Sequence, residues 1–122
     1  MTQTLSMDDL IDATSIRALF ADTTEARGLP GKAYGADFYT IEQRELFPKA
    51  WCVAGMVSDL PNTGDMTPVE IGGWPVLLLR DGSGALKAFH NVCRHRAMRL
   101  VTEPCNQKVI VCPWHAWCYG LE

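Results

Sequence analysis

Cys93-Arg94-His95 and Cys112-Pro113-Trp114-His115 decide how this 122-residue chain is interpreted. Sixteen residues separate the two stretches, which gives the pattern C-x-H-x16-C-x-x-H. Each stretch pairs one thiol with one imidazole, and thiolate sulfur and imidazole nitrogen are soft or borderline ligands for transition metals. Because each pair stands in a loop at the end of a predicted strand, the two pairs can converge on one metal site.

Two kinds of metal site use two cysteines and two histidines. In one type of [2Fe–2S] cluster, two histidines replace two cysteines on one of the two irons. Cys93 and Cys112 would then hold one iron, while His95 and His115 hold the other. A tetrahedral zinc site is the alternative, but such sites usually pair Cys with Cys and His with His through short spacers. The mixed pairs favour the cluster, and a chain that binds no metal is the third alternative.

The N-terminal part of the sequence predicts a helical arm. Ser6 and Asp9 form a capping-box-like start for a helix over residues 6–20, whose apolar positions repeat at helical spacing. Leu29-Pro30-Gly31 breaks the chain. A second helix is predicted over residues 40–47 and ends there because a residue before proline disfavours the helical conformation.

From residue 51 onward, short apolar runs alternate with turns rich in glycine, proline and aspartate. We expect strands over residues 51–57, 67–71, 75–80, 86–90 and 108–111. Asp81-Gly82 lies between two apolar runs and predicts a hairpin. Short strands at close spacing predict a mainly β fold, a small antiparallel sandwich or barrel with an N-terminal helical arm. We therefore divide the chain into an arm and lead-in over residues 1–48 and a metal-binding domain over residues 49–122.

Composition excludes some classes of partner. The net charge is −3 and no run of basic residues occurs, which argues against nucleic acid or an acidic membrane surface. The N-terminus lacks a signal-peptide pattern, and the longest aliphatic run, residues 76–79, is too short to span a bilayer. Five cysteines with no secreted-scaffold pattern favour metal binding over disulfides and a cytoplasmic location.

Residues 89–101, FHNVCRHRAMRLV, and 112–117, CPWHAW, resemble the N-terminal Rieske domain of the α-subunit of Rieske non-haem iron oxygenases. The upstream stretches 29–31, LPG, and 45–51, ELFPKAW, are similar to the segment that leads into this domain. The resemblance implies a Rieske-type [2Fe–2S] cluster on Cys93, His95, Cys112 and His115. It further implies that a reductase or ferredoxin supplies electrons, which pass to a mononuclear Fe(II) in a following catalytic domain of a mono- or dioxygenase.

The sequence departs from the family pattern at several positions. Ala97 stands where the family usually has glycine, which tightens the backbone requirements of the first loop. Met98 and Trp114 occupy the positions of the cysteines that form a disulfide in respiratory Rieske proteins. Ala116-Trp117 follows His115 where high-potential proteins place a hydroxyl donor. We therefore expect a potential near the low end of the Rieske range, roughly −150 mV.

A 2-His-1-carboxylate iron site needs two histidines. The chain has three histidines and the cluster uses two, so His90 alone is left and the chain cannot build the catalytic iron site by itself. We expect a C-terminally incomplete oxygenase subunit: a truncated gene product, a split subunit or a shortened fragment. A stand-alone electron carrier of Rieske-ferredoxin type is the alternative, although the N-terminal arm favours the oxygenase.

The remaining polar and aromatic residues have two interpretations each. Arg94, Arg96 and Arg99 either guide an acidic electron donor or form an ordinary solvated loop. Trp114 and Trp117 either shield the cluster from water or are core aromatics. We interpret His90 and the cysteines outside the motif as structural, these cysteines being Cys52, Cys105 and Cys118.

Overall fold

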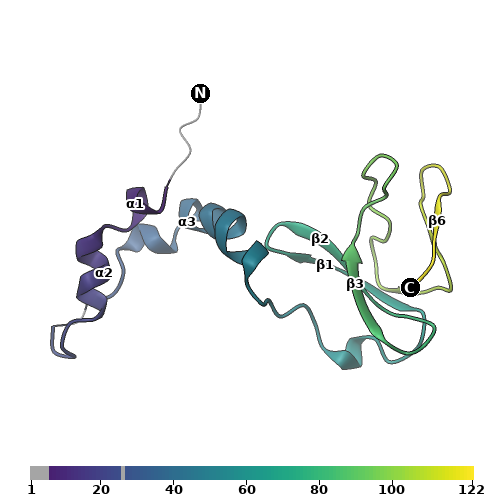
Figure 1. The fold of residues 1–122 in the computed structure, drawn as a ribbon, viewed down its shortest axis with the longest axis horizontal. Coiled ribbons are helices and arrows are strands. Elements are labelled where there is room, and N and C mark those ends of the chain that lie inside the picture. The colour runs from purple at the N-terminus through teal and green to yellow at the C-terminus, as the bar shows by residue number, and fades with distance from the viewer. Residues whose placement is uncertain (1–5, 26) are drawn as a thin grey trace. The chain divides into compact units, whose positions relative to one another are not determined.

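The computed structural model describes residues 6–25 and 27–122, so residues 1–5 and 26 of the predicted arm lie outside the described part. The chain forms two compact units, of which the first ends at Trp51 and the second begins at Cys52. Helices make up the regular structure of the first unit, and strands dominate the second (Figure 1). No helix in the described ranges is long and apolar enough to cross a membrane.

The predicted helix over residues 6–20 is two helices. The capping box is confirmed, because the Ser6 amide donates to the Asp9 carboxylate at 2.8 Å, and α1 (Met7–Leu10) follows. Ile11 then adopts an extended backbone, with φ −132° and ψ 115°. Asp12 caps α2 (Ala13–Leu19) by accepting a hydrogen bond from the Ser15 amide at 2.7 Å. The prediction of one continuous helix was wrong because an aspartate inside the pattern starts a new helix.

The break between α1 and α2 places Leu10 and Ile11 in the core of the first unit. They pack with Ala33 of η1 (Gly31–Tyr34) and Ile41 of α3 (Ala36–Ile41). The helical path continues through η2 (Glu42–Leu46) and η3 (Phe47–Lys49). The second helical segment therefore begins before residue 40 and passes Pro48, which is tolerated near the start of η3 because amides in a first turn need no internal partner.

Six strands form two antiparallel sheets in the second unit. Four of them, β1, β2, β3 and β6, are labelled in Figure 1. In the four-stranded sheet the order is β3-β2-β1-β4, and the two-stranded sheet pairs β5 with β6. A short helix, η4 (Val57–Asp59), precedes the strands. The strand bounds are β1 (Asp65–Ile71), β2 (Trp74–Arg80), β3 (Leu86–His90), β4 (Cys105–Asn106), β5 (Ile110–Val111) and β6 (Cys118–Tyr119).

Turn chemistry explains the β1–β2 hairpin. Gly72 and Gly73 have φ values of 56° and 80°, and Ile71 pairs with Trp74 across the turn. Two positive φ values in a two-residue connection suit the right-handed twist of the strands and favour glycine at both positions. The predicted hairpin at Asp81-Gly82 is also confirmed, because β2 and β3 pair as antiparallel neighbours.

Two predicted strands need correction, and two observed strands were not predicted. Residues 51–56 form no strand, since no ladder partner pairs with them among the described residues. The strand predicted over residues 108–111 contains only Ile110–Val111. Strands β4 and β6, of two residues each, were not predicted, because so short a segment shows no alternation of apolar and polar residues.

The core of the second unit joins the two sheets. Alternate residues of β2, Leu77 and Leu79, are 1% and 0% exposed, as the two-residue period of a strand dictates. They cluster with Met66 of β1, Ile110 of β5 and Leu121 after β6. The expected fold class, mainly β with a small helical N-terminal part, is confirmed.

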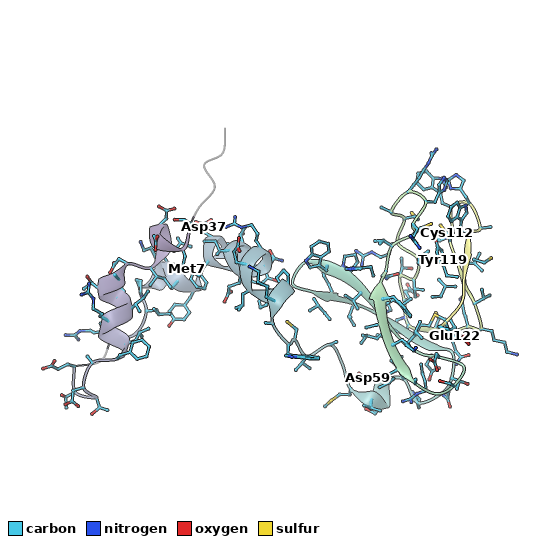
Figure 2. The ribbon with its side chains drawn as sticks, viewed as in Figure 1. Met7, Asp37, Asp59, Cys112, Tyr119 and Glu122 are labelled. Carbon is cyan, nitrogen blue, oxygen red and sulfur yellow. The ribbon has the colours of Figure 1, made fainter. Side chains whose placement is uncertain are left out.

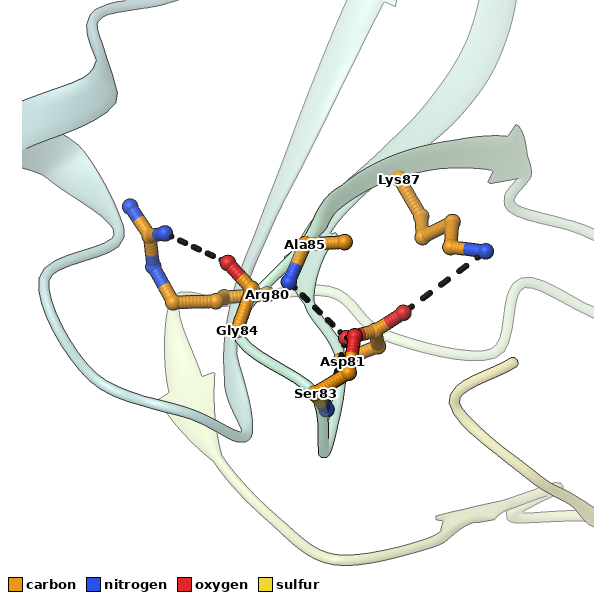
Figure 3. A network of polar contacts seen from close by, with 6 residues as sticks. All are labelled: Arg80, Asp81, Ser83, Gly84, Ala85 and Lys87. Carbon is orange, nitrogen blue, oxygen red and sulfur yellow. Dashed lines mark hydrogen bonds and ion pairs between the residues drawn. The ribbon is translucent and has the colours of Figure 1, made fainter.

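A buried carboxylate holds the β2–β3 turn together (Figure 3). Asp81 Oδ1 accepts hydrogen bonds from the Ser83 hydroxyl at 2.6 Å and from the amides of Ser83 and Ala85, both at 2.9 Å. Lys87 Nζ lies 3.6 Å from Asp81 Oδ2. The Ser83 hydroxyl is the main cause that lowers the pKa of Asp81, with help from both amides and Lys87 and against the effect of burial.

We predict that Asp81→Asn lowers the melting temperature at neutral pH and that the loss shrinks as the pH falls. A lowered pKa in the folded state means that ionised Asp81 stabilises the fold above its unfolded pKa and stops doing so below its folded pKa. Thermal unfolding followed by circular dichroism between pH 7 and pH 3 measures the difference. Lys87→Ala is the control and should cost less, because its partly exposed ion pair is weak. An equal loss for Asp81→Asn at both pH limits would contradict this assignment.

Candidate metal centre

Two loops carry the four predicted ligands, and they share one backbone pattern. The first loop, residues 91–101, follows β3, and the second, residues 112–117, joins β5 to β6. In the first loop, the Cys93 amide donates to the Met98 carbonyl at 2.7 Å, and the Ala97 amide donates to the Cys93 carbonyl at 2.8 Å. In the second loop, the Cys112 amide donates to the Trp117 carbonyl at 2.8 Å, and the Ala116 amide donates to the Cys112 carbonyl at 3.0 Å.

An alanine in the left-handed region turns the chain in each loop. Ala97 has φ 56° and Ala116 has φ 55°, and both stand four residues after the cysteine of their loop. A non-glycine residue in this region costs about 1–2 kcal/mol. Ala97, which replaces the glycine usual in the family, therefore stands at a position where the backbone does favour glycine. The hydrogen bonds of the loop offset the conformational cost of the alanine.

Asn91 closes the base of the first loop. Its side chain is fully buried, with 0% exposed area. Nδ2 donates to the Val101 carbonyl at 2.6 Å, and Oδ1 accepts from the Val101 amide at 3.0 Å. The Asn91 side-chain amide thus pairs with the Val101 backbone as a residue of a neighbouring strand would, and this joins the two ends of the loop. The pairing lies just outside the backbone bridge between Val92 and Arg99. Residues 93–98 are held between these fixed ends.

The two thiols lie buried on the inner side of the loops. Cys93 and Cys112 are 3% and 2% exposed. The Tyr119 hydroxyl lies 3.0 Å from Cys93 Sγ and accepts a hydrogen bond from the Arg94 amide at 3.1 Å. Tyr119 is the main cause that lowers the pKa of Cys93; backbone amides of the loop and the Cys112 side chain add to this effect, while burial opposes it.

The pKa of Tyr119 changes in the direction that this hydrogen bond requires. The hydrogen bond to Cys93 raises the pKa of Tyr119, so the pair is most stable with a protonated phenol and a thiolate. Metal ligation requires the thiolate form of cysteine. Cys112 and Tyr119 are labelled on the second loop and the strand that follows it in Figure 2.

The two imidazoles lie on the exposed side of the same loops. The rings of His95 and His115 have centroids 4.9 Å apart at 72°. Each ring also stacks on a tryptophan of the second loop: Trp117 on His95, with centroids 4.9 Å apart at 5°, and Trp114 on His115, at 5.0 Å and 23°. The Trp117 contact crosses from one loop to the other and orients the His95 ring.

This arrangement suits a two-iron cluster. Sulfur lies near sulfur on the buried side and ring lies near ring on the exposed side, as a cluster with thiolates on one iron and imidazoles on the other requires. The residues present therefore fit the cluster.

A family comparison covers the unit that holds these loops. Residues 50–122 match the model of the Rieske [2Fe–2S] domain. The chain belongs to the Rieske [2Fe–2S] domain family. The cofactor of this Rieske domain is a [2Fe–2S] cluster, as the sequence predicted.

Two relatives of this chain are oxygenase subunits. The chain is 38% identical over its whole length to the glycine betaine monooxygenase oxygenase subunit of Pseudomonas aeruginosa, and it spans 29% of that protein. It is 40% identical over 70% of its length to the anthranilate 1,2-dioxygenase large subunit of Acinetobacter baylyi, of which it spans 18%. Naphthalene 1,2-dioxygenase from Rhodococcus sp. superposes with a TM-score of 0.76 at 26% identity, over 88% of this chain and 25% of that one.

Sequence reasoning missed two residues of the site. Tyr119 supplies a hydroxyl to Cys93, whereas the sequence analysis noted only that Ala116-Trp117 lacks one. A tyrosine four residues after the last histidine, on the strand leaving the second loop, was the available signal. Asn91, two residues before Cys93, carried no motif of its own. His90, interpreted as structural, packs against Trp74 with ring centroids 5.8 Å apart.

We predict that Asn91→Ala destabilises the domain by roughly 1–3 kcal/mol, because it leaves a buried amide and carbonyl of Val101 without partners. Urea unfolding of the cluster-loaded protein measures the loss. Asn106→Ala is the matched control, since it also removes two side-chain hydrogen bonds, to Thr63 and Asp65, but at an exposed site. Equal losses for the two variants would show that burial of the Asn91 amide is unimportant.

Proposed function

We propose that this chain transfers single electrons through a Rieske cluster whose irons are held by Cys93 and Cys112 on one side and by His95 and His115 on the other. The observation that carries the proposal is the segregation of ligands: both thiols are buried and both imidazoles are exposed on paired loops. When bound, the cluster accepts and returns one electron. Neutral imidazoles leave it less negatively charged than four thiolates would, which favours reduction.

The residues around the cluster have separate tasks in this proposal. Tyr119 and the loop amides place positive ends of dipoles at the Cys93 sulfur, where negative charge accumulates on reduction. Trp114 and Trp117 cover the imidazole rings and limit their contact with water. The exposed rings of His95 and His115 give an electron the shortest way between the cluster and the surface.

We propose that the electrons serve a non-haem iron oxygenase. The relatives are mono- and dioxygenase subunits, and this chain spans less than a third of their length. The domain over residues 49–122 would take electrons from a reductase or ferredoxin in the cytoplasm. It would pass them to a mononuclear Fe(II) in an oxygenase catalytic domain or a neighbouring subunit, where oxygen from O2 is inserted into an organic substrate.

The ligand set is tested by serine substitution. Cys93→Ser or Cys112→Ser should abolish the red-brown chromophore and the rhombic EPR signal of the reduced protein, because each removes one of two thiolate ligands. Cys105→Ser and Cys118→Ser are the matched controls, since these thiols lie outside the two ligand pairs, and both should keep the signal. Iron and acid-labile sulfide should each measure two per chain after anaerobic reconstitution.

Two results would reject the proposed cluster. One is stoichiometric zinc in protein isolated with ample iron, together with no EPR signal after reduction. The other is a full cluster signal in the Cys93→Ser and Cys112→Ser variants, which would show that other residues hold the irons.

Tyr119→Phe should lower the reduction potential by roughly 40 mV. The hydroxyl donates to a sulfur that is more negative in the reduced state, so its loss destabilises that state by about 1 kcal/mol. For one electron, a tenfold change in the equilibrium constant corresponds to about 59 mV. Redox titration followed by EPR gives the value, and Tyr34→Phe, which removes an exposed hydroxyl, is the control. An unchanged potential in Tyr119→Phe would exclude this hydrogen bond as a tuning contact.

A further inference from the structure

We propose that Trp117 is a positioning residue which, together with Tyr119, holds the ligand pair of the first loop in the arrangement that the cluster requires. The ligand pair is Cys93 and His95, and we call Trp117 and Tyr119 the aromatic pair. Both pairs touch through side chains of the chain itself. This inference rests on the proposed function, because it concerns how two of the proposed ligands are oriented.

The aromatic pair and the ligand pair have the same spacing. Trp117 stands directly before β6 and Tyr119 lies within it, two positions later, just as His95 follows Cys93 by two positions. In an extended chain, residues two apart point to the same face. The Tyr119 hydroxyl lies 3.0 Å from the Cys93 sulfur, and the Trp117 ring stacks on the His95 ring with centroids 4.9 Å apart. Each ligand of the first loop therefore has its own aromatic partner.

The backbone around the aromatic pair is fixed without help from the first loop. The Trp117 carbonyl accepts a hydrogen bond from the Cys112 amide at 2.8 Å. The next residue, Cys118, pairs with Val111 in the two-stranded sheet. The Tyr119 ring packs against the core cluster of the domain. The strand that leaves the second loop can therefore orient side chains of the first loop.

The orientation of the His95 ring depends on this contact. A metal-bound histidine is usually oriented by a hydrogen bond to its second ring nitrogen. In the described part of the chain, the His95 ring makes no hydrogen bond and has two ring contacts. His115 meets it edge-on at 72°, whereas Trp117 lies nearly parallel to it at 5°. A parallel stack restricts the tilt of the imidazole, so the indole face takes the place of the usual hydrogen bond.

Trp114 cannot have the same task. It stacks on His115, the next residue in the chain, so its contact stays within the second loop. The Trp117 stack instead joins residues of different loops. Of the two indoles, only Trp117 therefore links a ligand of the first loop to the second loop.

The first test measures the stack in the metal-free full chain. NMR of protein with isotope-labelled histidine reports the ring protons of His95, which are assigned with the His95→Gln variant. The ring current of an indole shifts protons over its face upfield, so the His95 signals should lie upfield in the wild type. Trp117→Ala should move them to the values of an unstructured peptide. Trp114→Ala should move the signals of His115 instead.

The second test measures how firmly the cluster-loaded chain holds its iron. The iron(II) chelator bathophenanthroline disulfonate is added to the reduced protein without oxygen, and the coloured complex gives the rate of iron release. Trp117→Ala should release iron roughly 10-fold faster, as expected when a group that orients a metal-bound histidine is removed. Trp117→Phe should stay close to the wild type, because its ring can still stack on His95.

Trp74→Ala is the matched control. Trp74 is 52% exposed, close to the 48% of Trp117, and it packs against His90, which is not a proposed ligand. This variant should release iron at the wild-type rate. Both alanine variants remove a half-exposed indole, so they should shift the midpoint of urea unfolding by similar amounts. Only the rate of iron release should distinguish them.

The outcomes separate this inference from the proposed function. A wild-type protein with no Rieske EPR signal after reduction rejects the proposed function, and the inference with it. In protein with the full signal, a Trp117→Ala variant that leaves either the His95 shift or the rate of iron release unchanged rejects the positioning role alone. Equal acceleration in Trp74→Ala rejects it too, because general destabilisation would then explain the effect. Metal-free wild type whose His95 signals already match an unstructured peptide also contradicts it.

Discussion

The contact between the Tyr119 hydroxyl and the Cys93 sulfur connects the core of the domain to the proposed metal centre. A thiolate removed from water is costly unless donors surround it, and Tyr119 is the donor with the largest effect on Cys93. The tyrosine ring packs against the core cluster that contains Leu77 and Leu79. Packing between the two sheets thus fixes the hydroxyl, and the hydroxyl in turn stabilises the charge on the sulfur.

The two loops share one backbone pattern but differ in the spacing between cysteine and histidine. In each loop the cysteine amide donates a hydrogen bond to the carbonyl five residues later. An alanine with positive φ then turns the chain. The histidine stands two residues after Cys93 in the first loop but three after Cys112 in the second. The shared backbone frame keeps both sulfurs inside, while the spacing lets both imidazoles reach the outside. Burial of sulfur and exposure of nitrogen are therefore two results of one loop design.

Stability and function place opposite demands on the exposed end of the loops. Water contact with the imidazoles is reduced by stacked tryptophans, yet these indoles are themselves half exposed. Large exposed aromatic side chains are costly in a monomer and common in interfaces. Arginines next to His95 in the chain add positive charge that suits the extra electron of a reduced cluster. The same indoles therefore cover the imidazole rings while remaining in contact with water themselves.

The sequence by itself determined what short segments can encode. The C-x-H and C-x-x-H stretches identified the metal chemistry, and the glycine and aspartate turns located β1, β2 and β3. Ser6 and Asp9 marked the first helix start because a capping box involves residues only three positions apart. The division into residues 1–48 and 49–122 remains a prediction.

Tertiary structure decided everything that depends on residues distant in the chain. The hydroxyl of Tyr119 reaches a cysteine 26 positions away, and Asn91 pairs with a residue ten positions away. Trp117 stacks on a histidine of the other loop. Strands β4 and β6 exist only because a partner supplies their hydrogen bonds. Local pattern cannot reveal such contacts, because the energy that selects them arises only when the sheets pack and bring the loops together.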